Sequence, residues 1–138
     1  MPANRETLVR YWMDKARRSL NAARREFEEQ NYDFCANRLY YAVFYAVSAV
    51  LILQGKSFKK HSGVRAALHR DLIKPGIIPE EYGTLYDALL RDREEIDYIA
   101  FVEPDPEVIK EEIIKVGELL NILADIIVTI KEGWETGK

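Results

Sequence analysis

The sequence has few of the residues from which cross-links and metal centres are built. Its 138 residues include one cysteine, Cys35, and two histidines. One cysteine cannot form a disulfide within the chain, and so few soft ligands argue against a structural zinc site. We interpret Cys35 as a small buried apolar side chain, with a nucleophilic thiol as the alternative. No metal and no cofactor is expected.

Glycine is also scarce, with seven residues, and none belongs to a phosphate-cradling loop or to a Gly-Ser pair followed by spaced aspartates. Nucleotidyltransferases hold metal and triphosphate with the second arrangement, so this chain is not expected to transfer phosphoryl groups itself. Carboxylates occur in neighbouring pairs, but neighbours on a helix point about 100° apart and cannot converge on one metal. A solvated helix face explains these pairs, which are Glu28-Glu29, Glu80-Glu81, Glu94-Glu95 and Glu111-Glu112.

The sequence lacks an apolar run long enough to cross a membrane. The longest, Leu39 to Leu53, has 15 residues, whereas a membrane-spanning helix needs about 20. This run predicts a buried helix that ends at Gly55, where a left-handed cap is expected. The N-terminal stretch is charged from the start and has no apolar core of the signal-peptide type, so we expect a cytoplasmic protein.

Alternation of apolar and polar residues, the mark of a half-buried strand, is missing as well. Apolar residues recur instead at intervals of three or four. With 48% hydrophobic and 31% charged residues, the chain suits one domain, residues 1–138, with its own core. We predict an all-α, up-and-down bundle of four to five helices. They are expected at residues 5–30, 39–53, 64–72, 79–103 and 106–132, the last with Asp105 as N-cap, Pro106 at its first position and Gly133 as its stop.

The net charge of −3 gives no overall attraction to nucleic acid, so any such partner must be argued from local clusters. The first cluster lies in "NRLYYAVFYA", where Arg38, Tyr41 and Tyr45 share one face of the apolar helix. One interpretation is structural: Arg38 pairs with an acid from another helix and the tyrosine hydroxyls reach the surface. The other is a ligand-binding face.

The second cluster is the basic stretch "KSFKKHSGV". Lys60 and His61, with neighbouring lysines, stand at a predicted helix start, where amide groups and flexible cations can hold a phosphate. Alternatively the lysines are solvated and His61 or Ser62 caps the helix.

The third cluster is "LLRDREEIDY", which contains Arg91, Arg93, Asp97 and Tyr98. Arg93 and Asp97 stand four apart, so a surface ion pair worth a few tenths of a kcal/mol is the simpler explanation. A phosphate site is the alternative.

Taken in order, these three stretches resemble the signatures of HEPN-domain proteins of the small stand-alone kind found in archaea and bacteria. "NRLYYAVFYA" is similar to the second-helix signature, "SFKKHSGV" to the histidine loop and "LRDREEIDY" to the fourth-helix arginine motif, and the similarity runs from about Leu8 to Ile130. The resemblance implies a bundle that forms homodimers, often encoded beside a minimal nucleotidyltransferase in a toxin and antitoxin arrangement. It also implies that many relatives are metal-independent ribonucleases whose site forms across the dimer.

The sequence departs from the ribonuclease pattern, an arginine and a histidine separated by about four to six residues. No arginine has a histidine at that spacing, and Arg65 and His69 have three residues between them. Asp97 or Tyr98 stands in the place of the histidine, and neither side chain alone exchanges protons near neutral pH. His61 would restore the pair if it approached Arg93 in space.

We therefore favour a non-enzymatic, dimeric binding module that contacts a nucleotidyltransferase partner and binds nucleotide or RNA phosphate. The alternatives are a ribonuclease toxin built on Arg91 or Arg93 with His61 or Tyr98, and an assembly domain whose polar residues are structural only. Trp12, the tyrosines and the long last helix offer apolar surface for a homodimer. The candidate binding residues are Arg38, Tyr41, Lys60, His61, Arg91, Arg93, Asp97 and Tyr98.

Overall fold

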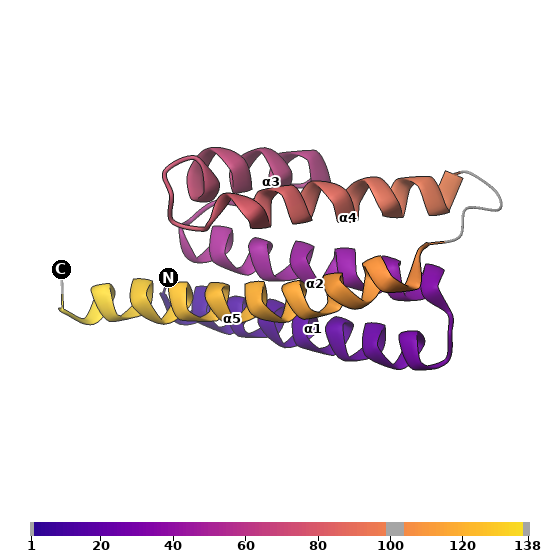
Figure 1. The fold of residues 1–138 in the computed structure, drawn as a ribbon. Helices are drawn as coiled ribbons and strands as arrows, with labels where there is room; N and C mark the ends of the chain where they lie inside the picture. Colours follow the sequence, from indigo (N-terminus) through magenta and orange to yellow (C-terminus); the bar gives the residue numbers. More distant parts are fainter. Residues whose placement is uncertain (1, 99–103, 137–138) are drawn as a thin grey trace.

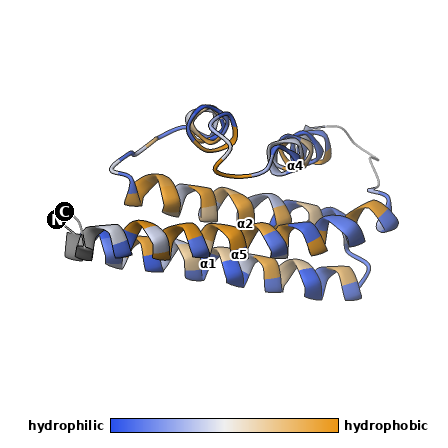
Figure 2. Ribbon diagram, turned by 60° about the vertical axis from the view of Figure 1, so that its left-hand side comes forward, coloured by the Kyte–Doolittle hydropathy of each residue, from blue (hydrophilic) through white to orange (hydrophobic). Residues whose placement is uncertain are grey.

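Helix α2 (Tyr32–Leu53) lies at the centre of the fold. It is apolar on nearly every face, so it must be covered on all sides, and 12 of its 22 residues are buried. Helices α1 (Pro2–Glu28) and α5 (Pro106–Thr136) lie on one side of α2, and α3 (His61–Ala67) and α4 (Glu80–Tyr98) on the other (Figure 1). In Figure 2, α2 is coloured as hydrophobic along most of its length, whereas hydrophobic and hydrophilic residues alternate along α1.

The computed structural model describes residues 2–98 and 104–136, with side chains over 4–98 and 104–133. Within these ranges the chain forms the five α-helices and one π-helical segment, η1 (Leu68–Ile73), and no strand. The predicted all-α bundle is therefore confirmed. The expected end of the fourth helix, at residues 99–103, lies outside the described residues.

The core helix is longer than its uninterrupted apolar run. At 22 residues α2 has the length and composition of a membrane span, but 61% of its most apolar stretch is buried inside the protein. Packing against α1, α4 and α5 accounts for that composition.

Two predicted helix caps agree with the structure, whereas α1 covers residues 2–28 and not 5–30, and α2 begins at Tyr32 and not at Leu39. Gly55 has a φ of 84° and follows α2 as its left-handed cap. At the start of α5, the Asp105 carboxylate accepts a hydrogen bond of 2.9 Å from the backbone N–H of Glu107. Gly133 was expected to end α5, and this is wrong because the helix continues to Thr136. A glycine inside a helix costs about 1 kcal/mol but does not by itself break the hydrogen-bond ladder.

The third predicted helix is instead two segments, because the α-helical turn widens after Ala67 into η1. The helix also begins three residues earlier than expected, at His61. Lys60 occupies the N-cap position without a side-chain hydrogen bond. Neither His61 nor Ser62 caps the helix, so that interpretation is wrong.

Cys35 lies in the core with 0% of its surface exposed. Burial, together with the nearby carboxylates of Glu112 and Glu26, raises the pKa of the thiol to about 12. A thiol with this pKa carries no thiolate at neutral pH, so the interpretation of Cys35 as a buried apolar side chain is confirmed.

Glu112 is a carboxyl group on the inner side of α5, with 8% of the residue exposed. Burial raises its pKa to about 7, and the charge of Asp92 on α4 adds to the increase, while Arg91 and Lys115 oppose it. One carboxyl oxygen, Oε1, has no hydrogen-bond partner among the described residues. Ionising this group therefore costs folding free energy.

We expect the Glu112→Gln variant to be more stable than the native protein at pH 8. The pKa of Glu112 is higher in the folded than in the unfolded protein, so protonation of Glu112 stabilises the folded state. This stabilisation is complete below the ordinary glutamate pKa and is lost as the pH rises through about 7. A neutral amide avoids that loss, which is about 3 kcal/mol for a pKa raised from 4.5 to about 7. Urea unfolding at pH 8 and pH 4.5, at one protein concentration, measures the difference.

The matched control is Glu111→Gln, because Glu111 is exposed on the same helix. It should leave the unfolding midpoint unchanged at both pH values. Equal effects of the two substitutions at pH 8 would contradict the assignment of the cost to burial of Glu112.

Candidate functional site

His61, the first residue of α3, lies over three aromatic rings of α2. Its imidazole stacks on Phe44, with 4.0 Å between ring centroids and 19° between the planes. The rings of Tyr40 and Tyr41 lie 5.8 and 5.9 Å from it. The Tyr40 hydroxyl and the Nδ1 atom of His61 are hydrogen-bonded at 2.8 Å. The histidine is therefore held in one orientation.

Arg93 reaches the same rings from α4. Its guanidinium carbon lies 5.4 Å from the Tyr40 ring centroid and 5.3 Å from that of Tyr41, within cation–π range. The side chain is 23% exposed and forms the predicted ion pair with Asp97, whose Oδ2 lies 3.5 Å from Nε without hydrogen-bond geometry. Nε is buried and has no hydrogen-bond partner among the described residues. Arg93 thus presents charge and an unused donor.

The ionisation states of these groups follow from their surroundings. Burial lowers the pKa of His61, and the positive charge of Arg93 lowers it further, so the imidazole is neutral near pH 7. Burial raises the pKa of Tyr40, so its hydroxyl keeps its proton. The tautomer of His61 decides which group donates in their hydrogen bond: with the ring proton on Nε2, the hydroxyl donates to Nδ1 and Nε2 is a free donor.

Arg38 also packs on Tyr41, with its guanidinium carbon 5.5 Å from the ring centroid. Ser19 of α1 donates a hydrogen bond to the Arg38 carbonyl oxygen at 2.7 Å, and Arg38 Nη2 donates to Asn37 at 2.8 Å. It forms no ion pair with another described residue, so the partner acid on another helix stays a prediction. Arg38 and Asp97 line a hollow of about 670 Å³.

The structure brings together five of the eight candidate residues, Arg38, Tyr41, His61, Arg93 and Asp97. We call these five, with Tyr40 and Phe44, the arginine–histidine cluster.

The other three candidates lie apart from the cluster. Lys60 precedes His61 in the chain, and its side chain is exposed. Arg91 acts on the pKa values of Asp92 and Glu112, which places it on the α5 side of α4, away from the arginine–histidine cluster. Tyr98 is 81% exposed at the end of α4.

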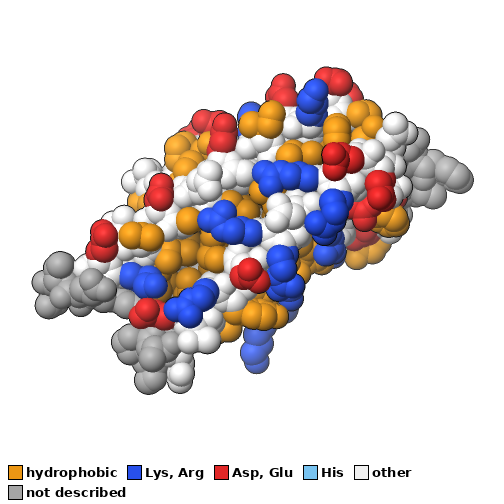
Figure 3. Space-filling view, turned by 90° about the horizontal axis from the view of Figure 1, so that it is seen from below, with side chains coloured by type: hydrophobic (Ala, Val, Ile, Leu, Met, Phe, Trp, Pro, Cys, Tyr) orange, Lys and Arg blue, Asp and Glu red, His pale blue; other side chains and the backbone are white. Residues whose placement is uncertain are grey.

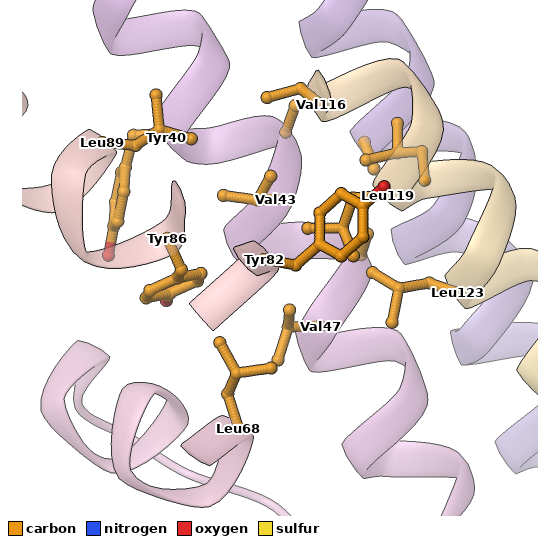
Figure 4. Packing of buried hydrophobic residues seen from close by; sticks show 14 of the residues in the cluster. Tyr40, Val43, Val47, Leu68, Tyr82, Tyr86, Leu89, Val116, Leu119 and Leu123 are labelled. Atoms are coloured by element: carbon orange, nitrogen blue, oxygen red, sulfur yellow. The ribbon is translucent and has the colours of Figure 1, made fainter. Parts of the chain in front are cut away.

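Sequence reasoning missed two residues of the cluster, Tyr40 and Phe44. It chose the face of Tyr41 and Tyr45, but Tyr45 packs on Trp12 of α1 at 5.4 Å, away from His61. Tyr40 points toward α4, beside Tyr86 and Leu89 (Figure 4). The repeated aromatics in "NRLYYAVFYA" signalled an aromatic surface, but not which ring would meet the histidine.

Arg65 and His69, the pair whose spacing is nearest to the ribonuclease pattern, are both hydrogen-bonded to Asp87. Arg65 donates two hydrogen bonds to Asp87, at 2.7 and 2.9 Å, and His69 Nε2 bonds the same carboxylate at 3.0 Å. Three neighbouring side chains thus satisfy one another. Within the described chain there is also no group of three or more histidine, cysteine or acidic side chains arranged to hold a metal ion.

Comparison with known proteins identifies the family. The HEPN domain family matches residues 9–127, so the chain belongs to that family. A UPF0332 protein of Thermotoga maritima is 36% identical over 127 residues, which are 92% of this chain and 96% of that protein. A protein of Methanocaldococcus jannaschii named putative toxin is 33% identical over 91 residues, 66% of this chain and 62% of its own.

We predict that NMR titration of His61 gives a pKa below the ordinary histidine value of about 6.5. Replacing Arg93 with glutamine should raise that pKa, because a positive neighbour disfavours protonation, but burial should keep it below the ordinary value. Arg91→Gln serves as the control, since Arg91 faces α5, and should leave the His61 titration unchanged. A His61 pKa insensitive to Arg93→Gln would show that the two groups are not in contact in solution.

Proposed function

We propose that this HEPN protein is a binding module that holds a phosphate of RNA or of a nucleotide at the arginine–histidine cluster. The observation that carries the proposal is the state of Arg93: a half-buried guanidinium packed on two tyrosine rings and paired with Asp97 at 3.5 Å, whose Nε–H makes no hydrogen bond with a described residue. Native proteins rarely leave a buried donor unpaired, and functional sites are where they do. A phosphate oxygen is the acceptor that fits a guanidinium best.

The neighbouring groups add to this preference for an anion. The guanidinium groups of Arg38 and Arg93 both pack on Tyr41, each within 5.5 Å of its ring centroid. The neutral His61 contributes an N–H donor without adding repulsion between positive charges. Each charge-assisted hydrogen bond to a phosphate contributes about 1.5–3 kcal/mol.

The hydrogen bond between Tyr40 and His61 favours binding over catalysis. A general base needs a free lone pair near neutral pH, and we propose that the Tyr40 hydroxyl donates to Nδ1 and so occupies its lone pair. Nε2 then carries the proton, so the imidazole donates to a phosphate but cannot accept a proton in this arrangement. We therefore propose that the module acts without cleaving its ligand.

A metal-independent ribonuclease is the second candidate, and one observation favours it. His61 and Arg93 are far apart in the sequence, yet both pack on the rings of Tyr40 and Tyr41. The arginine and histidine pair that the sequence lacks is thus restored through space. For cleavage, Tyr40 would have to release Nδ1 so that the imidazole could exchange a proton.

We further propose that the protein works as a homodimer in a toxin and antitoxin type of pair, with a minimal nucleotidyltransferase as its partner. Two relatives in Methanocaldococcus jannaschii are named putative toxins, which supports a role of this kind. Exposed apolar side chains support a dimer, since Leu8, Tyr11, Phe34 and Phe58 are between 37% and 57% exposed.

The binding proposal predicts that a fluorescent single-stranded RNA binds the protein in EDTA and remains intact. Arg93→Ala should weaken binding about tenfold and reduce the slope of log K against log salt by about 0.7, the loss of one phosphate contact. Arg91→Ala, on the α5 side of the same helix, should change neither quantity. Fluorescence anisotropy gives the affinity and a denaturing gel the state of the RNA.

Two results would overturn this proposal. Cleavage of the RNA in EDTA that disappears with Arg93→Ala and with His61→Asn would replace it with the ribonuclease. Equal affinity of the Arg91 and Arg93 variants would remove the arginine–histidine cluster from RNA binding.

The dimer proposal predicts a molar mass of twice 16.0 kDa by light scattering at micromolar concentration. Apolar side chains exposed in one copy should be covered by the other. A mass of 16.0 kDa across the micromolar range would contradict it.

A further inference from the structure

A groove runs between α1 and α5 on the outer face of the bundle. This face lies across α2 from α3 and α4, and hence away from the arginine–histidine cluster (Figure 1). Two hollows of about 180 and 500 Å³ follow one another along it and share Arg17 as a lining residue. Both are lined by residues of α1 and α5 alone. Figure 3 shows lysine and arginine side chains on this face beside a hydrophobic strip.

The groove is basic although the chain as a whole is acidic. Arg10, Arg17 and Arg24 line it at intervals of seven residues, and Lys131 lies at one end, paired with Glu6 at 3.5 Å. Arg10 and Arg17 are exposed and make no ion pair with a described residue, and Arg24 bonds the uncharged Asn21 at 3.0 Å. Four cations and one carboxylate thus line the groove, in a chain of net charge −3.

The floor of the groove is apolar and shallow. Leu20 of α1 and Leu120 of α5 contribute to the floor. Gly117 and Ala124 of α5 are small residues, so the floor stays open on that side. Ile114, at the edge, is 58% exposed. An apolar strip bordered by cations is a surface for an amphipathic partner, because it offers burial along the middle and charge pairing along the side.

We propose that this groove binds an amphipathic α-helix of a partner protein that carries carboxylates at seven-residue intervals. Seven residues are two turns of a helix and about 10.5 Å along its axis. A helix lying alongside α1 therefore places successive carboxylates opposite Arg10, Arg17 and Arg24 while its apolar face enters the groove. On the inner side, α2 already packs against both α1 and α5, so the same pair of helices can hold another helix outside.

Charge and composition distinguish this occupant from two others. Sites for single-stranded RNA combine cations with aromatic rings that stack on bases, and none of the residues lining the two hollows is aromatic. A second copy of the chain, joined face to face, would place arginines opposite arginines. An acidic helix satisfies both the charge and the apolar floor.

The test uses a fluorescent synthetic 21-residue helical peptide with glutamates at three positions seven apart and leucines on the adjoining face. Its control has the same composition with the glutamates moved out of this register. The full-length protein should bind the first peptide at least tenfold more tightly than the control, measured by anisotropy. Arg17→Glu should weaken binding about tenfold, and a peptide whose central glutamate is replaced by lysine should recover it.

Two variants distinguish binding in the groove from non-specific charge attraction. Arg18→Glu makes the same charge change at the next residue of α1, which does not line either hollow, and should leave binding unchanged. Gly117→Leu should abolish binding by filling the hollow, while leucine favours the helix more than glycine does. Circular dichroism confirms that each variant is folded.

Three results would overturn the inference. Equal binding of the two peptides, or equal effects of Arg17→Glu and Arg18→Glu, would show non-specific charge attraction. Competition by single-stranded RNA that Arg17→Glu abolishes would make the groove an RNA site. A change of oligomeric mass with Arg17→Glu would make it an interface between copies. Arg93→Ala should leave peptide binding intact, so this inference and the proposed function fail independently.

Discussion

The burial of α2 is the constraint on which the rest of the structure depends. A helix that is apolar on nearly every face cannot remain in water, and 12 of its residues are removed from solvent by helices on both sides. This requirement accounts for the layered arrangement, with α1 and α5 below and α3 and α4 above (Figure 1). It also decides where polar chemistry can occur, because only residues at the edges of the covered helix meet both core and solvent.

The arginine–histidine cluster is one such edge. The aromatic residues of α2 are large enough to belong to the core and to extend beyond it, so α3 and α4 each place a polar side chain on the same rings. His61 is held by a 2.8 Å hydrogen bond with Tyr40, and Arg93 by two ring faces. The packing that stabilises the bundle therefore also orients the donors and lowers the pKa of the histidine. Site and core share their side chains.

The outer groove has a different physical basis. Its arginines lie on α1 at a spacing set by the helix itself, and they touch none of the residues of the cluster. Because the two surfaces lie on opposite sides of α2, a ligand at one need not compete with a partner at the other. The two proposals together give a small chain a phosphate site on one face and a protein-docking site on the other.

Local patterns in the sequence determined the fold class, the central helix, the Gly55 and Asp105 caps and the burial of Cys35, because periodicity and capping act over a few residues. Tertiary structure decided the site. Arg91 and Arg93 are equivalent by composition, but positions two apart on a helix point about 200° apart, so the docking of α4 on α2 turns Arg93 inward and Arg91 toward α5. The pairing of Tyr40 with His61 spans 21 residues, and only the return of the chain over α2 brings the two side chains together.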